Sequence, residues 1–163
     1  MHNIFLALGS NLGDRLENIK KAIDLLNSEV RISKSALIYE SRAVGFKEQP
    51  NFLNTVVGGE TNFPPDDLLV FLKEVEKNVG RTKSVHWGPR EIDIDILFYD
   101  DLIFKNETLE IPHPQIASRD FVLVPMNDIA SDFIHPIFRK TIKQLLEEFP
   151  DSTKSILAQI SFS

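Results

Sequence analysis

Cysteine is absent from the 163 residues of this sequence. Disulfide bonds, thiolate metal sites and dithiol redox motifs are therefore excluded. No apolar run approaches the roughly 18 residues that a membrane-spanning helix requires. Residues 1–8 also lack the charged segment and the cleavage site of a secretory signal. From these absences we expect a cytoplasmic protein.

Positive charge is also scarce, with 18 lysines and arginines against 24 aspartates and glutamates and a net charge of -6. Affinity for nucleic acid comes mainly from lysine and arginine, so a general nucleic-acid or membrane surface is not expected. Hydrophobic residues at 42% and charged residues at 26% are typical of a globular protein. The length suits one domain, and we expect residues 1–163 to form it as a monomer.

The most informative stretch is HWGPREIDID, residues 86–95, where isoleucines alternate with Asp93 and Asp95. This period-two pattern predicts a half-buried strand with both carboxylates on one face. Aspartate is depleted in strands and the two charges repel each other, so the face needs either bulk water or a cation. Mg²⁺ accepts such oxygen ligands and usually brings phosphate. The alternative is an edge strand with two solvated aspartates.

A basic segment precedes these carboxylates. Residues 81–90 hold Arg81, Lys83, His86 and Arg90 with no acid among them. Beside a carboxylate pair, such a segment suits a metal-bound phosphate ligand. The alternative is a solvated loop whose cations only aid solubility.

Hydrophobic periodicity and turn residues give the order of the other elements. We expect strands at 4–8, 32–41 and 52–61, helices at 16–26 and 66–79, short extended pieces at 102–104 and 109–111, and helices starting near 122 and 141. The order β-α-β-β-α-β predicts a ferredoxin-like α+β sandwich with C-terminal additions, an antiparallel sheet with two helices on one face. Residues 150–163 carry no interpretable motif.

Three further features leave alternatives open. The turn GSNLG at 9–13 either brings backbone N–H groups to a ligand or only connects a strand to a helix. Asn54, beside Phe52, either pairs with the edge of a heterocyclic ring or bonds core backbone. Leu69, Lys73 and Glu76 share a helix stripe that could line a site, although Lys73 and Glu76 also fit a solvent-facing charge pair.

Four motifs in order along the chain resemble the signature of the 6-hydroxymethyl-7,8-dihydropterin pyrophosphokinases of folate biosynthesis (HPPK). They are GSNLG at 9–13, QPxFLN at 49–54, WGPRxxDxD at 87–95 and PHPxxxxRxF at 112–121. The resemblance implies the same ferredoxin-like fold and a transferase that moves the β,γ-pyrophosphoryl unit of ATP to the pterin. It also implies two Mg²⁺ ions and, as partners, the small-molecule substrates ATP and 6-hydroxymethyl-7,8-dihydropterin.

The resemblance further implies roles for individual residues. Asp93 and Asp95 inherit the metal role, Asp95 or Asp93 could help to deprotonate the attacking hydroxyl, and Arg81 and Arg90 contact the polyphosphate during catalysis. The implied nucleotide-binding residues are Leu69, Lys73, Glu76, Lys83, Trp87, Ile96, His113 and Arg119. The implied pterin-binding residues are Ser41, Val44, Phe52, Asn54 and Phe121. We also expect residues 81–90 to close over ATP as a lid.

Several positions depart from the family pattern, including Lys73 for a glutamine, His86 for an arginine and Arg42 for a proline. These changes bear on nucleotide affinity more than on the reaction. Two other classes remain open from the residues alone. One is an RNA-recognition or small-molecule regulatory module on the same scaffold, although the aromatic K/R-G-F/Y signature of the RNA modules is missing. The other is a different two-metal nucleotidyl or phosphoryl transferase.

Overall fold

A computed structural model of the chain describes residues 1–43, 48–80 and 90–160. One sheet has the order β5-β1-β4-β3-β8, and β2 also pairs with β4. All of its pairings are antiparallel. Its strands are β1 (His2–Ser10), β2 (Val30–Ser35), β3 (Ile38–Ser41), β4 (Phe52–Thr61), β5 (Asp93–Tyr99) and β8 (Ile156–Ile160).

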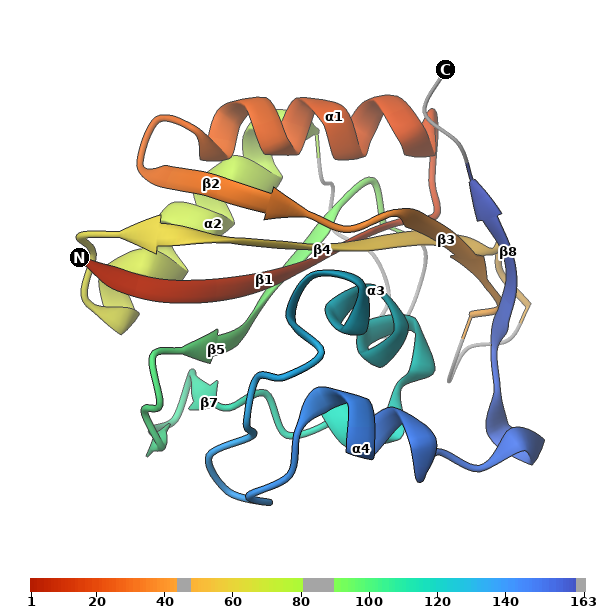
Figure 1. Cartoon of the computed structure of the whole chain (residues 1–163). Coiled ribbons are helices and arrows are strands. Elements are labelled where there is room, and N and C mark those ends of the chain that lie inside the picture. Colours follow the sequence, from red (N-terminus) through yellow and green to blue (C-terminus); the bar gives the residue numbers. More distant parts are fainter. Residues whose placement is uncertain (44–47, 81–89, 161–163) are drawn as a thin grey trace.

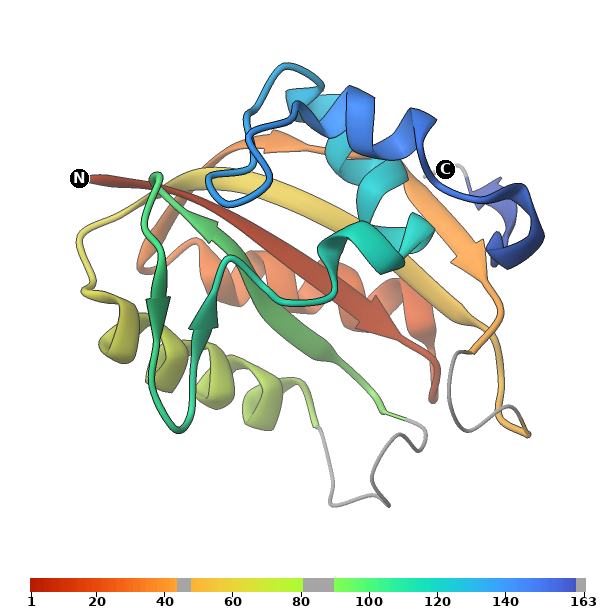
Figure 2. The ribbon, with the colours of Figure 1, turned by 90° about the horizontal axis from the view of Figure 1, so that it is seen from below.

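Helices cover both faces of this sheet (Figures 1 and 2). On one side lie α1 (Arg15–Leu26) and α2 (Pro65–Val79), and on the other α3 (Asp120–Ala130) and α4 (Ile142–Glu147). The short strands β6 (Phe104–Lys105) and β7 (Glu110–Ile111) pair with each other, and the 3-10 turns η1 (Ile116–Ser118) and η2 (Asp151–Thr153) complete the described chain. The expected ferredoxin-like α+β fold, with C-terminal additions on the second face, is confirmed.

Each face of the sheet has its own hydrophobic core. Leu6, Leu68 and Ile94 belong to the core beneath α1 and α2. Val56 and Leu123 belong to the core beneath α3 and α4. The sheet is thus packed between two layers of helices.

The predicted alternation along β5 is confirmed. Ile92, Ile94 and Ile96 are at most 4% exposed and pack in the core beneath α1 and α2. Asp93 and Asp95 therefore project from the opposite face. The sheet thus places both carboxylates on the side of α3.

The ends of α1 and α2 follow the expected local chemistry. The Asp14 side chain caps α1 by accepting a hydrogen bond from the Glu17 backbone N–H at 3.1 Å. Gly80 ends α2 with a left-handed φ of 119°, a conformation that glycine adopts without steric cost. Asp14 thus fills the N-terminal cap of α1.

Two expectations about strands were incomplete. The segment predicted as one strand at 32–41 is divided into β2 and β3. Between them, the Thr55 hydroxyl donates to the carbonyls of Ala36 and Leu37, and Ala36 N–H donates to the Val56 carbonyl. Strand β8 was not predicted, because its five residues mostly face solvent and it forms by pairing with β3.

None of the helices in the described parts of the chain combines the length and apolar character needed to cross a bilayer.

Adjacent glycines in β4 allow a matched stability test. A Cβ on Gly59 would lie 2.4 Å from the backbone oxygen of Arg31, whereas a Cβ on Gly58 would meet the Phe5 ring at 2.9 Å. Because backbone of the paired strand β2 cannot rotate away, we predict that Gly59→Ala lowers the unfolding free energy by about 1–3 kcal/mol and by more than Gly58→Ala. Urea denaturation of both variants measures this, and equal losses would contradict it.

Candidate active site

A cavity opens between the sheet and the start of α3. Nine of the residues expected at the site line it: Ser41, Phe52, Asn54, Arg90, Asp93, Asp95, His113, Arg119 and Phe121. They come from β3, β4, β5 and the segment entering α3. The structure thus brings the expected metal, phosphate and pterin residues together from segments far apart in the sequence.

The carboxylate pair forms the acidic part of this cavity. Burial, followed by the negative charge of Asp93, raises the pKa of Asp95 to about 7 from an ordinary 3.8, and Arg119 opposes that rise. The Asp95 side chain remains 37% exposed, so water or a ligand still reaches it. The pair accumulates negative charge where solvation is incomplete, which favours a bound cation.

His113 lies directly against this pair. Its Nε2 atom is 3.9 Å from Asp95 Oδ2, and its Nδ1 accepts a hydrogen bond from the Gln115 backbone N–H at 3.2 Å. Burial and then the charge of Arg119 lower the pKa of His113 to about 4. The imidazole is therefore neutral at pH 7 and carries its proton on Nε2, so it offers the cavity a neutral hydrogen-bond donor.

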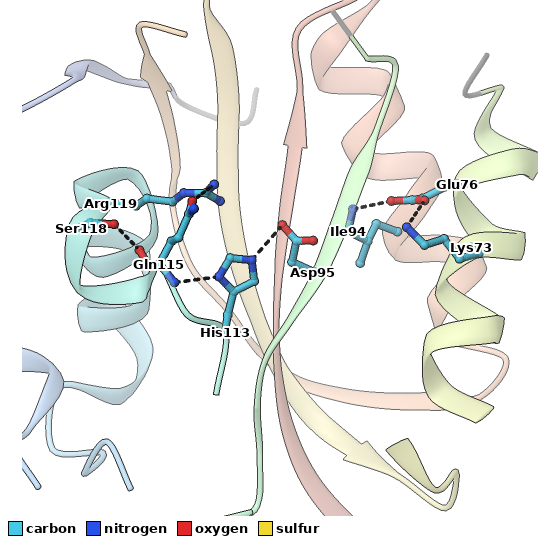
Figure 3. Close-up of polar contacts among 8 residues, drawn as sticks. All are labelled: Lys73, Glu76, Ile94, Asp95, His113, Gln115, Ser118 and Arg119. Atoms are coloured by element: carbon cyan, nitrogen blue, oxygen red, sulfur yellow. Dashed lines mark hydrogen bonds and ion pairs between the residues drawn. The ribbon is translucent and has the colours of Figure 1, made fainter. Parts of the chain in front are cut away.

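Arg119 supplies positive charge opposite the carboxylates. Its Nη2 donates to the Gln115 side-chain oxygen, and its guanidinium lies over the Phe121 ring at 5.5 Å. Figure 3 shows Arg119, Gln115 and His113 on one side of β5 together with Asp95. Burial lowers the pKa of Arg119, which the charges of Asp95 and Asp93 partly restore. A guanidinium fixed by these contacts is suited to an anionic ligand group.

The opposite part of the cavity carries Asn54 and Phe52. Asn54 is 7% exposed and donates from Nδ2 to Ser41 Oγ at 2.7 Å. A Cβ on Gly9 would lie 2.9 Å from Asn54 Oδ1 and 3.4 Å from Phe52 Cδ1, so glycine is required on the neighbouring strand. Among the described residues, Asn54 thus bonds a side chain in the cavity wall, which favours the interpretation in which its amide faces a ligand.

Within the GSNLG turn, Asn11 forms hydrogen bonds to two other segments of the chain, one before β4 and one before β5. Its side chain donates to Gln49 Oε1 and the Pro50 carbonyl, at 2.8 and 3.1 Å. Its Oδ1 accepts from Arg90 N–H at 2.7 Å, and its own N–H donates to the Arg90 carbonyl at 3.0 Å. The N–H group of Asn11 thus bonds Arg90 and is not directed at a ligand.

Four expected nucleotide residues lie away from the cavity lining. Ile96 packs in the core beneath α1 and α2. Glu76 is 2% exposed and accepts a hydrogen bond from Ile94 N–H at 2.8 Å, on the other side of β5 from Asp95 (Figure 3). Lys73 is exposed and its Nζ lies 3.6 Å from Glu76 Oε1, while Leu69 packs against the same core. The interpretation of Lys73 and Glu76 as a solvent-facing pair is therefore wrong for Glu76, and the nucleotide roles of all four stay predictions.

Several expectations concern parts of the chain outside the described residues. They are the roles of Val44, Arg81, Lys83 and Trp87 and the lid formed by residues 81–90. These remain predictions from the sequence.

Several residues that line the cavity were not predicted as site residues from the sequence. Gly9, Arg42, Thr55 and Val122 contribute to the cavity wall. Arg42 and Val122 directly follow the expected residues Ser41 and Phe121, so adjacency was the available signal. Gly9 and Thr55 are strand residues whose role depends on pairing with neighbouring strands.

The carboxylate oxygens that line the cavity are suited to binding Mg²⁺. Within residues 1–43, 48–80 and 90–160, no cluster of three or more His, Asp or Glu residues could cage a metal. Mg²⁺ does not need such a cage, because it is usually bound by one or two carboxylates together with water and substrate phosphates. Asp93 and Asp95 provide the carboxylates, and the basic groups nearby provide for phosphate.

On this antiparallel α+β domain, the acidic pair, the guanidinium and the polar cavity wall suit a transferase of phosphate groups. The sequence profile of 7,8-dihydro-6-hydroxymethylpterin-pyrophosphokinase (HPPK) matches residues 5–131. The chain is 47% identical over 148 residues to the 2-amino-4-hydroxy-6-hydroxymethyldihydropteridine pyrophosphokinase of Aquifex aeolicus, covering 91% of this chain and 92% of that protein. The chain belongs to the HPPK family.

Two other comparisons agree. The Bacillus subtilis protein of the same name is 41% identical over 132 residues, covering 79% of each chain. Among solved structures, a triple mutant of Plasmodium falciparum HPPK-DHPS superposes with a TM-score of 0.74 at 17% identity. That alignment covers 90% of this chain and 43% of the solved one, and at such low identity it shows the fold alone.

The raised pKa of Asp95 can be tested by stability measurements that need no substrate. Because its folded pKa of about 7 exceeds the ordinary 3.8, ionisation of Asp95 destabilises the fold as pH rises from about 4 to 7. We predict that Asp95→Asn gains stability relative to the parent over this range, by about 1 kcal/mol after allowance for solvent exposure. Denaturant titrations at pH 4 and 8 in a chelator measure the gain. The exposed Asp24→Asn serves as control, and equal pH dependence of parent and Asp95→Asn would rule the effect out.

Proposed function

We infer that this protein transfers the β,γ-pyrophosphoryl unit of ATP to the hydroxymethyl oxygen of 6-hydroxymethyl-7,8-dihydropterin, releasing AMP. Membership of the HPPK family supports the reaction. The observation that carries the inference at the level of residues is a single cavity with a carboxylate pair at one part and Phe52 and Asn54 at the other. Such a cavity can hold a metal-bound phosphate beside a flat heterocycle.

We further propose that Asp93 and Asp95 hold two Mg²⁺ ions together with the ATP phosphates. The pKa of Asp95, raised by burial and then by the charge of Asp93, supports this, because a bound cation stabilises the ionised carboxylates. Bound Mg²⁺ supplies neutralisation of the charge on the transferred phosphates. Arg119 and Arg90, which line the same cavity, add positive charge for the polyphosphate.

The pterin occupies the other part of the cavity in this proposal. Phe52 and Phe121 both line it and offer apolar ring faces for stacking. Ser41 accepts one amide hydrogen of Asn54, which leaves the amide the capacity to pair with the edge of the heterocycle. The Ser41 contact orients the Asn54 amide before the ligand arrives.

The chemistry is an in-line displacement at the β-phosphorus. The pterin hydroxymethyl oxygen forms a bond to that phosphorus, and the bond from it to the oxygen bridging to the α-phosphorus breaks. AMP leaves with that oxygen. The hydroxyl proton passes to Asp95 or Asp93, the only acidic residues among the described residues of the lining. The neutral His113 donates from Nε2 toward a phosphate oxygen or Asp95. Positioning and charge neutralisation supply most of the rate.

The same proposal treats residues 1–163 as one pyrophosphokinase domain that works as a monomer. The lining residues, from Ala7 to Val122, form one cavity against one sheet and its helices, which supports the single domain.

The reaction is tested by product analysis with carboxylate variants. Purified protein with ATP, Mg²⁺ and the pterin is expected to form AMP and pterin diphosphate in equal amounts. Asp93→Asn and Asp95→Asn each lower kcat on the order of 10³-fold with the fold retained, because the metal-bound phosphates lose a ligand. Asp24→Asn controls for loss of one surface charge. A folded double variant with near-normal turnover would refute the metal role.

Binding of the two substrates is separable by mutation. We predict that Phe52→Ala and Asn54→Ala weaken pterin binding roughly tenfold or more and leave binding of an ATP analogue nearly unchanged, because stacking and edge hydrogen bonds act on the ring. Calorimetry with each ligand measures both affinities. Equal losses for both ligands would mean that the two side chains act through the fold.

A further inference from the structure

A buried carboxylate outside the cavity lining has three hydrogen-bond donors from the C-terminal segment. Asp120, in the first turn of α3, is 3% exposed. Its Oδ2 accepts from the backbone N–H groups of Ser155 and Ile156 at 2.8 and 3.1 Å, and its Oδ1 accepts from Ser155 Oγ at 2.6 Å. Burying a carboxylate is costly unless it is fully hydrogen bonded, so this contact fixes Asp120 and Ser155 tightly together.

The position of Asp120 in the chain connects this contact to the site. Its neighbours Arg119 and Phe121 both line the cavity. Arg119 is held separately, because its guanidinium donates to Gln115. The Phe121 side chain has no hydrogen-bonding group, so its place depends on packing against the second core and on the backbone of the first turn that Asp120 anchors.

Ser155 connects to the cavity by a second route. Its carbonyl accepts from Arg42 N–H at 2.9 Å, and the adjacent Lys154 carbonyl accepts from Arg42 Nη2 at 2.7 Å. Ser41, one residue earlier, pairs with Ile156 in the sheet. The Ser41 hydroxyl in turn accepts from Asn54 Nδ2. The C-terminal segment therefore reaches Phe121 through Asp120, and Asn54 through Arg42 and Ser41.

We propose that Asp120 and Ser155 are positioning residues for the pterin half of the cavity, holding its two walls at a fixed separation. This inference rests on the proposed function. It assigns residues 154–156 a role in the reaction although none of them lines the cavity. The nucleotide half depends less on the contact, because Asp93 and Asp95 come from β5 and Arg119 has its own partner.

The test separates pterin KM from ATP KM. Asp120→Asn keeps the size of the side chain but removes its charge and one of its two acceptor oxygens, so the charge-assisted hydrogen bonds to the three donors are weakened. We expect the KM for the pterin to rise roughly tenfold while the KM for ATP and kcat change less than about twofold. Ser155→Ala, which removes only the hydroxyl donor, is expected to give a smaller rise of about threefold with the same selectivity. It also serves if Asp120→Asn does not fold.

The control is a buried hydroxyl at the far end of β4. Thr61 donates to the Glu29 carbonyl at 3.1 Å and accepts from Phe63 N–H at 3.2 Å, so Thr61→Val removes comparable bonds away from the cavity. It is expected to lower the melting temperature without changing either KM. Asp120→Asn and Ser155→Ala variants that behave like Thr61→Val, or that raise both KM values equally, would overturn the positioning role. An inactive parent protein would instead overturn the proposed function.

Discussion

Repulsion between two carboxylates is the constraint on which the site depends. The alternation of β5 puts Asp93 and Asp95 on the face opposite the buried isoleucines, and burial of Asp95 in the cavity limits its screening by water. The groups around Asp93 and Asp95 reduce the negative charge of the pair but do not cancel it. Arg119 faces the pair, and His113 is kept neutral by burial and by Arg119, so it does not neutralise the carboxylates at pH 7. In the proposed function, a divalent cation with phosphate offsets the remaining charge.

The same strand supports the site from its other face. Glu76 on α2 accepts the N–H of Ile94, the residue between the two aspartates, while the Ile94 side chain packs in the core. A buried charge-assisted hydrogen bond at this point fixes the backbone that carries both carboxylates. In the opposite part of the cavity, Gly9 leaves room for the side chains of Asn54 and Phe52, and Ser41 orients the Asn54 amide. Strand pairing therefore holds the side chains in both parts of the cavity in place before a ligand binds.

The sequence predicted what depends on local periodicity and motif. The strand faces of Asp93 and Asn54, the end of α2 at Gly80 and the ferredoxin-like order of elements all follow from patterns within a few residues. Features that depend on partners distant in the chain were not predictable. Strand β8 exists because β3 offers it an edge, Asp120 is buried because Ser155 donates to it, and Glu76 points inward because a backbone N–H needs an acceptor. The raised pKa of Asp95 likewise results from burial that only the assembled fold provides.

The proposed role of Asp93 and Asp95 requires that nucleotide binds to this pair only together with a divalent cation. Thermal unfolding with α,β-methylene ATP, which cannot undergo the displacement, tests it directly. Mg²⁺ alone or the analogue in a chelator is expected to shift the melting temperature little, whereas the two together raise it by several degrees, since ligands that bind only the folded state stabilise it. An equally large shift with the analogue in chelator would contradict the account.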